Sequence, residues 1–457
     1  MINGRNWFGR AGAVLSNGQN PSAENLQKNG HSYPDGGENQ RSEPHKLGLW
    51  QRRIVLSALV LAFAASFFVY ARRSVDFAGY AAVGQAFLDG RDIYLDTPVG
   101  TNTWPPFFSL AAVPLGLLDR ASPYFARIVW IALCWASIIW ALDLIARLIY
   151  GKRLKFRLKE NSLAITSPEL LVPFALTLPF IINNFELLQI NMILFSLALW
   201  GLYLQANGRE AAGGIAIAAA AAMKVMAIAF LPYLLYRKRW RAAFWVAAAT
   251  LVFFFSPALF LGWRKFWSGA ALWPVALRAS WGAGNAHQSV YSMWDRILGY
   301  RYLPFMAPGT FMLPLSGARS AKLAWEITCA ILAAVGAIAF RRTPLPNSRW
   351  AQVEWAAVFV AATILSPLTR KPYLVVLLFP YALLYAAWHS TDLAWRDRRI
   401  LRNAIFVSFA LSLPTLHDLI GKSLAVRLEM GSVVTYGSLI LLGSLLWYRS
   451  RAPRQVS

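Results

Sequence analysis

An aspartate just after the first long apolar run is the residue in this chain best suited to acid–base chemistry. Asp76 lies a few residues after the run Ile54–Tyr70 and is followed by Phe77 and Tyr80. A carboxylate at a membrane surface can take the proton of a hydroxyl when the two groups are within hydrogen-bond reach. The same polar segment holds three more aspartates: Asp89, Asp92 and Asp96. Ordinary loop roles account for those three, such as a turn at Asp89-Gly90.

Three basic residues lie where an apolar environment makes positive charge costly. Lys224 is in the middle of the apolar run Ala211–Tyr236, and Arg370 and Lys371 follow Ser366-Pro367 between two apolar runs. A charged side chain at the centre of a membrane helix costs at least about 2.5 kcal/mol, which suggests that Lys224 has a partner. The alternative is a side chain that snorkels to the membrane surface from a tilted helix or a short loop.

The elements that must position these residues are membrane helices. Apolar residues make up 57% of the 457 residues and charged residues only 14%, and the mean hydropathy is +0.43. Soluble proteins contain about 45–50% apolar and about 25% charged residues. Several runs approach the roughly 20 residues that a membrane helix needs. They are Ile54–Tyr70, Ile128–Leu148, Ala242–Leu261 and Leu323–Phe340.

The net charge of +24 follows from clusters of Lys and Arg between the apolar runs. Such clusters are typical of cytoplasmic loops, and no nucleic-acid-binding module accompanies them, so we expect no nucleic-acid partner. The clusters are Arg52-Arg53, 152–159, 237–241, Arg341-Arg342, 396–402 and 449–454. With all six on the cytoplasmic side, both termini are cytoplasmic and the chain makes about 12 membrane passes. The external segments are then 72–103, 183–186, 262–319, 366–371 and 417–429.

Two apolar runs do not fit a simple series of crossings. Trp104–Leu118 is short, and we expect a re-entrant or interfacial helix that does not cross. Ala211–Tyr236 has basic residues at both ends. A hairpin of two half-helices that turns near Lys224 puts both ends in the cytoplasm, whereas a single tilted helix with a snorkelling lysine is the competing interpretation.

The ends of the chain and its two cysteines have simpler interpretations. Residues 1–50 are polar and without periodicity, so we expect a disordered cytoplasmic tail before a membrane domain over 51–450. The first apolar run reads as a retained helix, not as a cleaved signal peptide. Cys134 and Cys329 lie in apolar runs, so we expect packing roles and neither a disulfide nor a metal site.

A series of motifs in this chain resembles glycosyltransferase family 87. The motifs, over about residues 54–390, are Asp76-Phe77-x-x-Tyr80, Gly90-Arg-Asp-Ile-Tyr94, Trp104-Pro-Pro-Phe107, Gln189-Ile-Asn191, Lys224 before a Pro-Tyr and Arg-rich end, His287-Gln288-Ser289 and Ser366-Pro367. The family contains polyprenyl-phosphate-mannose-dependent mannosyltransferases of the GT-C membrane class. The resemblance therefore implies an all-α transmembrane bundle of GT-C type in the plasma (inner) membrane.

The resemblance also implies an activity. The enzyme would move a hexose, expected to be mannose, from a polyprenyl-phosphate carrier to a hydroxyl of a glycan or glycolipid on the external face, with inversion in a single displacement. Asp76 matches the essential aspartate of the first external loop and would be the base. Lys224, Arg370 and Lys371 would stabilise the phosphate, because a leaving phosphate needs cationic or amide donors.

The resemblance also points to residues that could contact the substrates. Tyr80, His287, Gln288 and Asn191 are the candidate substrate-binding residues. The Asp-x-Asp pair of some GT-C enzymes is missing, so we expect no metal ion and no other cofactor. Many relatives carry histidine shortly after the Ser-Pro, where this chain has Thr369-Arg370-Lys371-Pro372-Tyr373.

Two other classes of protein are compatible with the sequence. A polytopic transporter or a lipid or polysaccharide flippase also places charge in the membrane and breaks helices near a binding site. The chain shows no obvious internal repeat, and its aspartate-rich segment favours surface chemistry. A structural membrane subunit would leave Asp76 and Lys224 without a role, so we rank it last.

Overall fold

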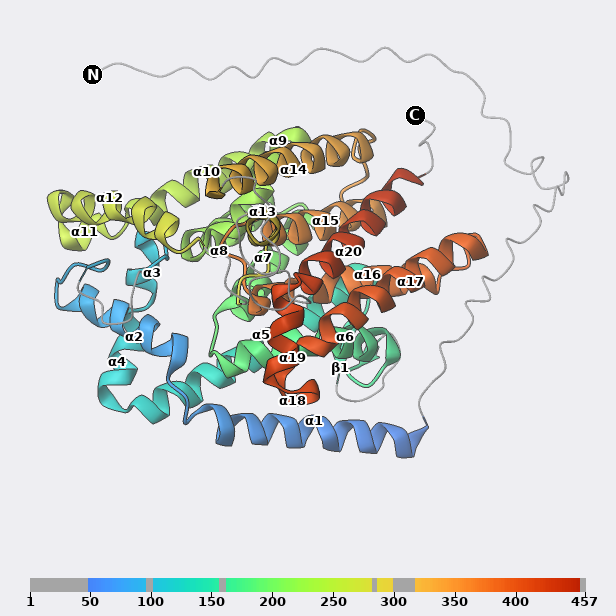
Figure 1. Cartoon of the computed structure of the whole chain (residues 1–457), viewed down its shortest axis with the longest axis horizontal. Helices are drawn as coiled ribbons and strands as arrows, with labels where there is room; N and C mark the ends of the chain where they lie inside the picture. The colour runs from blue at the N-terminus through green and yellow to red at the C-terminus, as the bar shows by residue number, and fades with distance from the viewer. Residues whose placement is uncertain (1–47, 96–101, 156–161, 282–285, 299–316, 453–457) are drawn as a thin grey trace, which may run out of the picture. The chain divides into compact units, whose positions relative to one another are not determined.

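The computed structural model describes residues 48–95, 102–155, 162–281, 286–298 and 317–452. All of them belong to Pro44–Ser457, one of two units into which the chain divides, so the expected tail lies almost wholly outside the described residues. The expected all-α fold is confirmed (Figure 1). The longer helices are α1 (Leu49–Tyr70), α2 (Val75–Leu88), α5 (Pro123–Tyr150), α6 (Pro168–Glu186), α7 (Asn191–Ala206), α8 (Glu210–Met223), α10 (Trp240–Phe255), α12 (Trp263–Ala279), α14 (Gly317–Ala339), α15 (Arg349–Leu365), α16 (Leu378–Trp388), α17 (Trp395–Ser412) and α20 (Val433–Ser450).

Shorter elements connect and interrupt these helices. They are α3 (Pro106–Ala111), α4 (Val113–Ala121), α9 (Phe230–Tyr236), α11 (Ala258–Leu261), α13 (Val290–Leu298), α18 (His417–Ile420), α19 (Lys422–Met430), the 3-10 helices η1 (Val225–Ala229), η2 (Lys371–Leu377) and η3 (Leu413–Thr415), and the strands β1 (Arg153–Lys155) and β2 (Ser162–Ala164). The two strands pair in parallel, with Leu154 opposite Leu163.

Local sequence sets the limits of the long helices. At the start of α5 the Ser122 hydroxyl accepts a hydrogen bond from Phe125 N at 3.4 Å, and Pro123 occupies the first helical position. The same helix ends at Gly151, whose φ of +67° is favourable for glycine but not for other residues.

Six helices in the described ranges are long and apolar enough to cross a membrane, or up to seven if the bent pair α19 and α20 forms one span. The six are Trp50–Tyr70, Pro123–Tyr150, Pro168–Glu186, Trp240–Leu261, Arg319–Ala339 and Lys371–Trp388. This number does not confirm the prediction of about 12 passes. Shorter apolar helices, such as α7 and α8, lie beside the spans.

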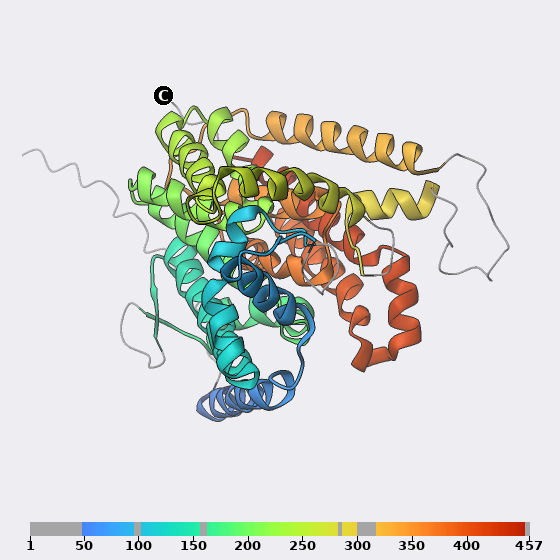
Figure 2. The same ribbon diagram turned by 90° about the vertical axis from the view of Figure 1, so that its left-hand side faces the viewer.

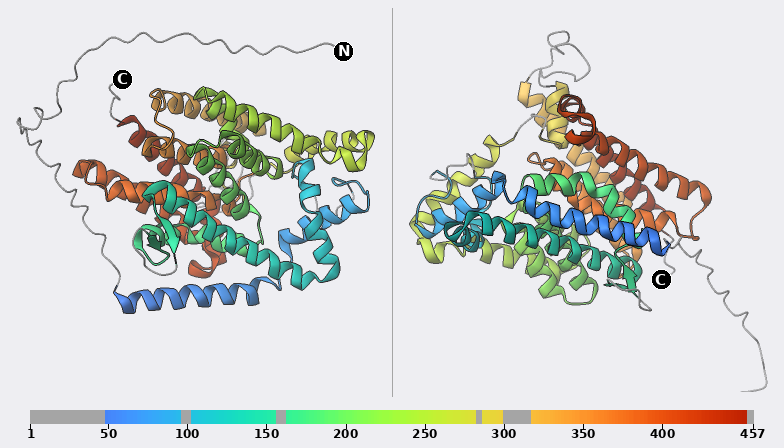
Figure 3. Two further views of the ribbon diagram at one scale, coloured as in Figure 1. Left: turned by 180° about the vertical axis from the view of Figure 1, so that it is seen from behind. Right: turned by 90° about the horizontal axis from the view of Figure 1, so that it is seen from below.

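The spans differ greatly in how much protein covers them. The span Lys371–Trp388 is 78% buried, whereas Trp50–Tyr70 and Arg319–Ala339 are each only 6% buried. Helix α1 runs along α5, where Trp135 Nε1 donates to Ser66 Oγ at 2.9 Å (Figure 3, right). Helix α14 lies at the edge of the bundle and packs mainly on α13 (Figure 2). The outer faces of both helices are apolar and suited to contact with lipid.

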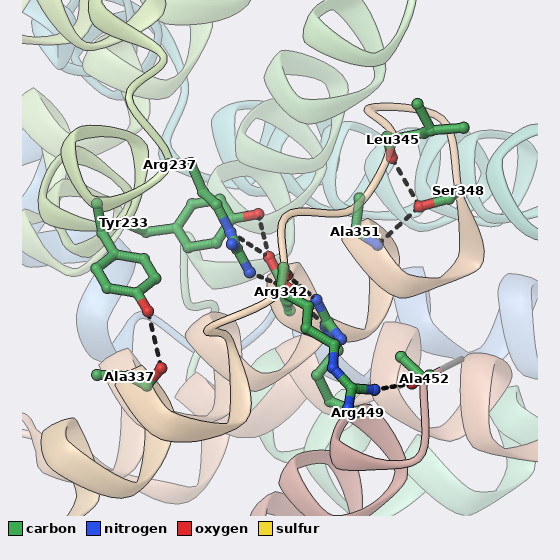
Figure 4. Close-up of polar contacts among 11 residues, drawn as sticks. Tyr233, Arg237, Ala337, Arg342, Leu345, Ser348, Ala351, Arg449 and Ala452 are labelled. Atoms are coloured by element: carbon green, nitrogen blue, oxygen red, sulfur yellow. Dashed lines mark hydrogen bonds and ion pairs between the residues drawn. The ribbon is translucent and has the colours of Figure 1, made fainter. Parts of the chain in front are cut away.

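Several of the basic clusters that the sequence assigns to one membrane side lie together in the structure. Arg237 and Arg449 both form ion pairs with the buried Glu354 (Figure 4). Beside them, Gln352 Nε2 donates to Leu148 O at 2.6 Å, close to the 152–159 cluster. We call this end of the bundle the arginine end. Its location in the cytoplasm remains a prediction.

Four of the five segments assigned to the external side are linked by hydrogen bonds or an ion pair, and the fifth, 183–186, directly precedes Leu187 in the chain. Trp273 Nε1 donates to Thr103 O at 3.1 Å. Asp76 N donates to Leu187 O at 3.3 Å, and Gln288 N donates to Thr369 O at 2.7 Å. The Lys371 ammonium lies 2.5 Å from a carboxylate oxygen of Glu429. The structure therefore groups the segments as the distribution of charge predicts.

The two runs that did not fit simple crossings form short, interrupted helices. Trp104–Leu118 lies in α3 and α4, which pack on α2, and Arg120 pairs with Asp89 at 2.5 Å. Neither helix is a candidate span. The run Ala211–Tyr236 turns at Lys224, and its two ends meet where Arg239 pairs with Glu210 at 3.1 Å. The geometry is therefore that of the hairpin and not of the single tilted helix.

Candidate active site

The candidate base begins a helix that follows the first membrane span. Asp76 occupies the first turn of α2, a position where the helix dipole favours a negative charge. Its backbone N–H donates to Leu187 O in the connection between α6 and α7. The side chain is half-buried, so it lies at the boundary between the protein interior and the surface.

Lys224 lies at the turn of the hairpin. Its backbone is extended (φ −157°, ψ 117°) between α8 and η1, so the helical hydrogen bonding is interrupted there. The ammonium donates to Asn191 Oδ1 at 2.7 Å and lies 3.3 Å from the centroid of the Tyr373 ring. A cation over an aromatic face is attracted by the ring quadrupole. These two contacts supply the partners that a lysine at this depth requires.

A chain of buried amides continues from Lys224. Asn191 Nδ2 donates to Gln189 Oε1 at 3.0 Å and to Asn184 Oδ1 at 3.3 Å. Asn184 Nδ2 donates in turn to Pro372 O at 2.6 Å. All three amides are buried, and each bond fixes the orientation of the next. The chain therefore holds α6, α7, the hairpin and η2 in a fixed relation.

Arg370 reaches the same region from the segment before η2. Its backbone is extended and pairs with His287 in an isolated antiparallel bridge. Burial, with the charges of Arg370 and Arg296 nearby, lowers the pKa of His287 to about 4. His287 is therefore neutral at pH 7, and with one ring nitrogen engaged by the Ser280 backbone, the other nitrogen can contact a ligand.

The electrostatics of Asp76 connect it to both cations. Burial raises the pKa of the Asp76 carboxyl above its ordinary value, and the charges of Arg370 and Lys224 offset part of this rise. Within the described ranges neither cation forms a salt bridge with Asp76. The arrangement is a partly desolvated carboxylate with two cations nearby that do not bind it directly, which suits a base beside an anionic leaving group.

Tyr80 lies one helical turn after Asp76 but is in the core. Its hydroxyl accepts a hydrogen bond from Ile190 N at 3.3 Å, and its ring packs on Trp104, Phe108 and Trp130. The side chain is 1% exposed. This geometry gives Tyr80 a role in positioning the segment between α6 and α7, and its expected contact with substrate remains a prediction.

Two further predicted site residues belong to a neighbouring network around Glu429. Lys371 pairs with this carboxylate and donates to Thr415 O at 2.8 Å, and Gln288 Nε2 donates to Glu429 O at 2.9 Å. Both side chains are buried. The structure thus brings together Asp76, Asn191, Lys224, His287 and Arg370. Lys371 and Gln288 instead contact Glu429.

Sequence reasoning did not assign a role to three residues of these networks: Asn184, Tyr373 and Glu429. Asn184 lies in an apolar helix, where a polar side chain is a signal that could have been noticed. Tyr373 lies two residues after Lys371, and its ring is the aromatic partner of Lys224. Among the described residues, no group of three or more His, Cys, Asp or Glu side chains could hold a metal ion.

Comparison with known families gives one match. The model of glycosyltransferase family 87 matches residues 102–368, which is more than half of the chain. The chain belongs to glycosyltransferase family 87. Within the matched segment lie Asn191, Lys224, His287 and Gln288, whereas Asp76 precedes it and Arg370 and Lys371 follow it directly. The family resemblance drawn from the motifs is confirmed, and the protein is a membrane glycosyltransferase.

Comparison with solved structures also gives matches. Two are of ArnT from Cupriavidus metallidurans, one bound to undecaprenyl phosphate and one in the apo state, and both are 14% identical to this chain. The first has a TM-score of 0.38 and covers 86% of this chain and 78% of that chain, and the second has a TM-score of 0.37 and covers 87% and 78%. A search of curated proteins gave no match.

Proposed function

We propose that this family 87 enzyme transfers a hexose from a polyprenyl-phosphate carrier to a hydroxyl of a glycan or glycolipid at the external face of the plasma (inner) membrane. Mannose is the sugar that the family resemblance implies. The observation that carries the proposal is the position of Asp76, a partly buried carboxylate under the influence of Lys224 and Arg370 where the external segments meet.

The reaction is a single displacement with inversion at the anomeric carbon. Asp76 accepts the proton of the acceptor hydroxyl as its oxygen forms a bond to that carbon. The bond between the anomeric carbon and the phosphate oxygen breaks, and the electron pair leaves with polyprenyl phosphate. Lys224 and Arg370 stabilise the negative charge that gathers on the phosphate.

Neighbouring residues position these groups. Asn191 holds the Lys224 ammonium, and His287 lies beside Arg370, where a neutral imidazole can bind a sugar hydroxyl. Lys371 and Gln288 fix the segments that carry Arg370 and His287, through Glu429. We therefore assign Lys371 a positioning role, with Lys224 and Arg370 as the phosphate contacts.

The test is the replacement Asp76→Asn, which keeps size and hydrogen bonding but removes the proton acceptor. We expect turnover to fall by about a hundredfold or more, with donor binding retained. Sugar transfer from a panel of polyprenyl-phosphate sugars is measured in liposomes at equal expression, beside donor binding.

Matched controls are Asp89→Asn and Asp92→Asn in the same external segment. Asp89 pairs with Arg91 and Arg120 on the surface, and Asp92 accepts from the backbone N–H groups of Tyr94 and Leu95, so both changes should affect transfer far less. Transfer by Asp76→Asn at the parental rate would refute the general-base assignment. If the parent transfers no sugar from any donor in the panel, a lipid flippase becomes the better interpretation.

A further inference from the structure

A groove at the arginine end of the bundle is separate from the candidate active site. It has a volume of about 460 Å³ and lies between the end of α14 and the end of α20. Its walls are apolar, with Val335 and Ile338 on one side and Gly443, Leu446 and Trp447 on the other. Val335 and Ile338 are 43% and 66% exposed, so nothing in the described part of the chain covers them.

The head of the groove is positively charged. Arg341, Arg342 and Arg449 line it. Arg237 pairs with the same carboxylate as Arg449 (Figure 4). Glu354 is the carboxylate that pairs with this group, through Arg237 and Arg449. In the described ranges Arg341 has no ion-pair partner, and Arg342 donates to one backbone carbonyl, that of Ala452. A guanidinium carries five N–H donors, so both arginines retain donors for an outside acceptor.

The combination of walls and head determines what can fill the groove. A water-filled gap between exposed apolar helices is unfavourable within a bilayer, and an acyl chain fits such walls. Guanidinium groups bind phosphate by charge-assisted hydrogen bonds at the point where the apolar walls end. Basic pockets between membrane helices on the cytoplasmic side are typical sites for the headgroups of anionic lipids.

We infer that this groove binds one anionic phospholipid of the bilayer, with the phosphate on Arg341 and Arg342 and an acyl chain between α14 and α20. The lipid is a structural ligand that joins the peripheral α14 to the bundle. This role does not depend on the transferase chemistry, since the groove and Asp76 lie among different groups of segments.

The test uses the full chain purified in detergent. Dioleoylphosphatidylglycerol should raise the thermal unfolding midpoint and remain bound in native mass spectrometry, whereas dioleoylphosphatidylcholine should do neither. The double variant Arg341→Gln/Arg342→Gln should bind phosphatidylglycerol about tenfold or more weakly. Arg341→Gln alone should show part of the loss and leaves the contacts of Arg342 and Arg449 intact.

A matched control is Arg399→Gln, an exposed arginine in another cluster of the same predicted side. It should bind phosphatidylglycerol as the parent does. Equal protection by phosphatidylcholine, or undiminished phosphatidylglycerol binding by both arginine variants, would overturn the inference. Protection by glycerol 1-phosphate alone would show a site for free phosphate, and selective binding of undecaprenyl phosphate would show a carrier-lipid site. Either result would contradict a phospholipid site.

Discussion

At the scale of single residues, the candidate site depends on a carboxylate whose ionisation is balanced by opposing effects. Burial favours the protonated form of Asp76, and the charges of Arg370 and Lys224 favour the ionised form. A base must be ionised to accept a proton, so activity should be lost as the pH falls through the pKa of Asp76. Because that pKa is raised, the loss should begin at a higher pH than for an ordinary carboxyl.

This balance predicts the effect of Arg370→Gln on the pH profile. Arg370 lowers the pKa of Asp76, so its removal should raise that pKa and move the acid limb of the profile to higher pH. The measurement is kcat/KM for sugar transfer as a function of pH.

Arg72→Gln is the control, because it removes an exposed positive charge that rests on the Phe68 ring, close to Asp76 in the sequence. Its acid limb should stay at the parental pH. An Arg370→Gln profile with lower rates but the same acid limb would mean that Arg370 does not act on Asp76.

At the scale of elements, one buried ion pair joins η2 to α19. The side chains of Lys371 and Glu429 are 10% and 2% exposed, and the His417 ring lies 3.4 Å from the same carboxylate. Breaking a buried pair by removing one partner costs about 3–5 kcal/mol, because the other charge remains buried. The pair therefore fixes the segment that carries Arg370.

Lys371→Gln should accordingly lower the free energy of unfolding by about 3–5 kcal/mol. The double variant Lys371→Gln/Glu429→Gln should recover part of this loss, because no Glu429 charge is left without its lysine, although the buried Arg296 also loses the attraction of Glu429. Denaturant unfolding in detergent micelles gives the values.

The exposed pair Lys322 and Glu326, at 3.7 Å, provides the comparison. Lys322→Gln should cost less than about 1 kcal/mol. If Lys371→Gln costs no more than Lys322→Gln, the buried pair does not hold η2.

The same segment shows where prediction from sequence ends. The pattern of charge was enough to suggest the hairpin at Lys224, with a single tilted helix as the alternative, and to predict the grouping of the external segments. It could not separate Arg370 from Lys371, because neighbouring residues on an extended backbone project in opposite directions. Only the three-dimensional arrangement places Arg370 beside His287 and Lys371 beside Glu429. Asn184 and Tyr373 were missed for a related reason, since their partners are far away in the sequence.

At the scale of the whole molecule, two groups of segments lie at separate ends of the bundle. Arg237, Arg449 and Glu354 mark one group, and Asp76, Gln288 and Thr369 mark the other. The family match covers 102–368 and thus includes segments from both groups. The grouping agrees with the predicted distribution of charge, although the six or seven candidate spans in the described ranges do not confirm the predicted 12 passes.

Reporter fusions test which group faces the cytoplasm. Fusions at Arg239 and Arg398 should report the cytoplasm and a fusion at Asp92 the external side, because basic clusters are retained inside. Alkaline phosphatase and a fluorescent protein that matures only in the cytoplasm give complementary signals. An external signal at Arg239 would contradict both the predicted orientation and the placement of the hairpin ends in the cytoplasm.

The hairpin at Lys224 bears on whether the number of membrane crossings before α10 is odd or even. Glu210 and Arg239, which bound it, are paired at 3.1 Å, so the segment between them returns to the level from which it departs. Because a hairpin begins and ends on the same side, it adds either no membrane crossing or two. Its insertion during evolution would have left α10 to α20 in their original orientation, and a lysine could enter the membrane interior without inverting any helix that follows.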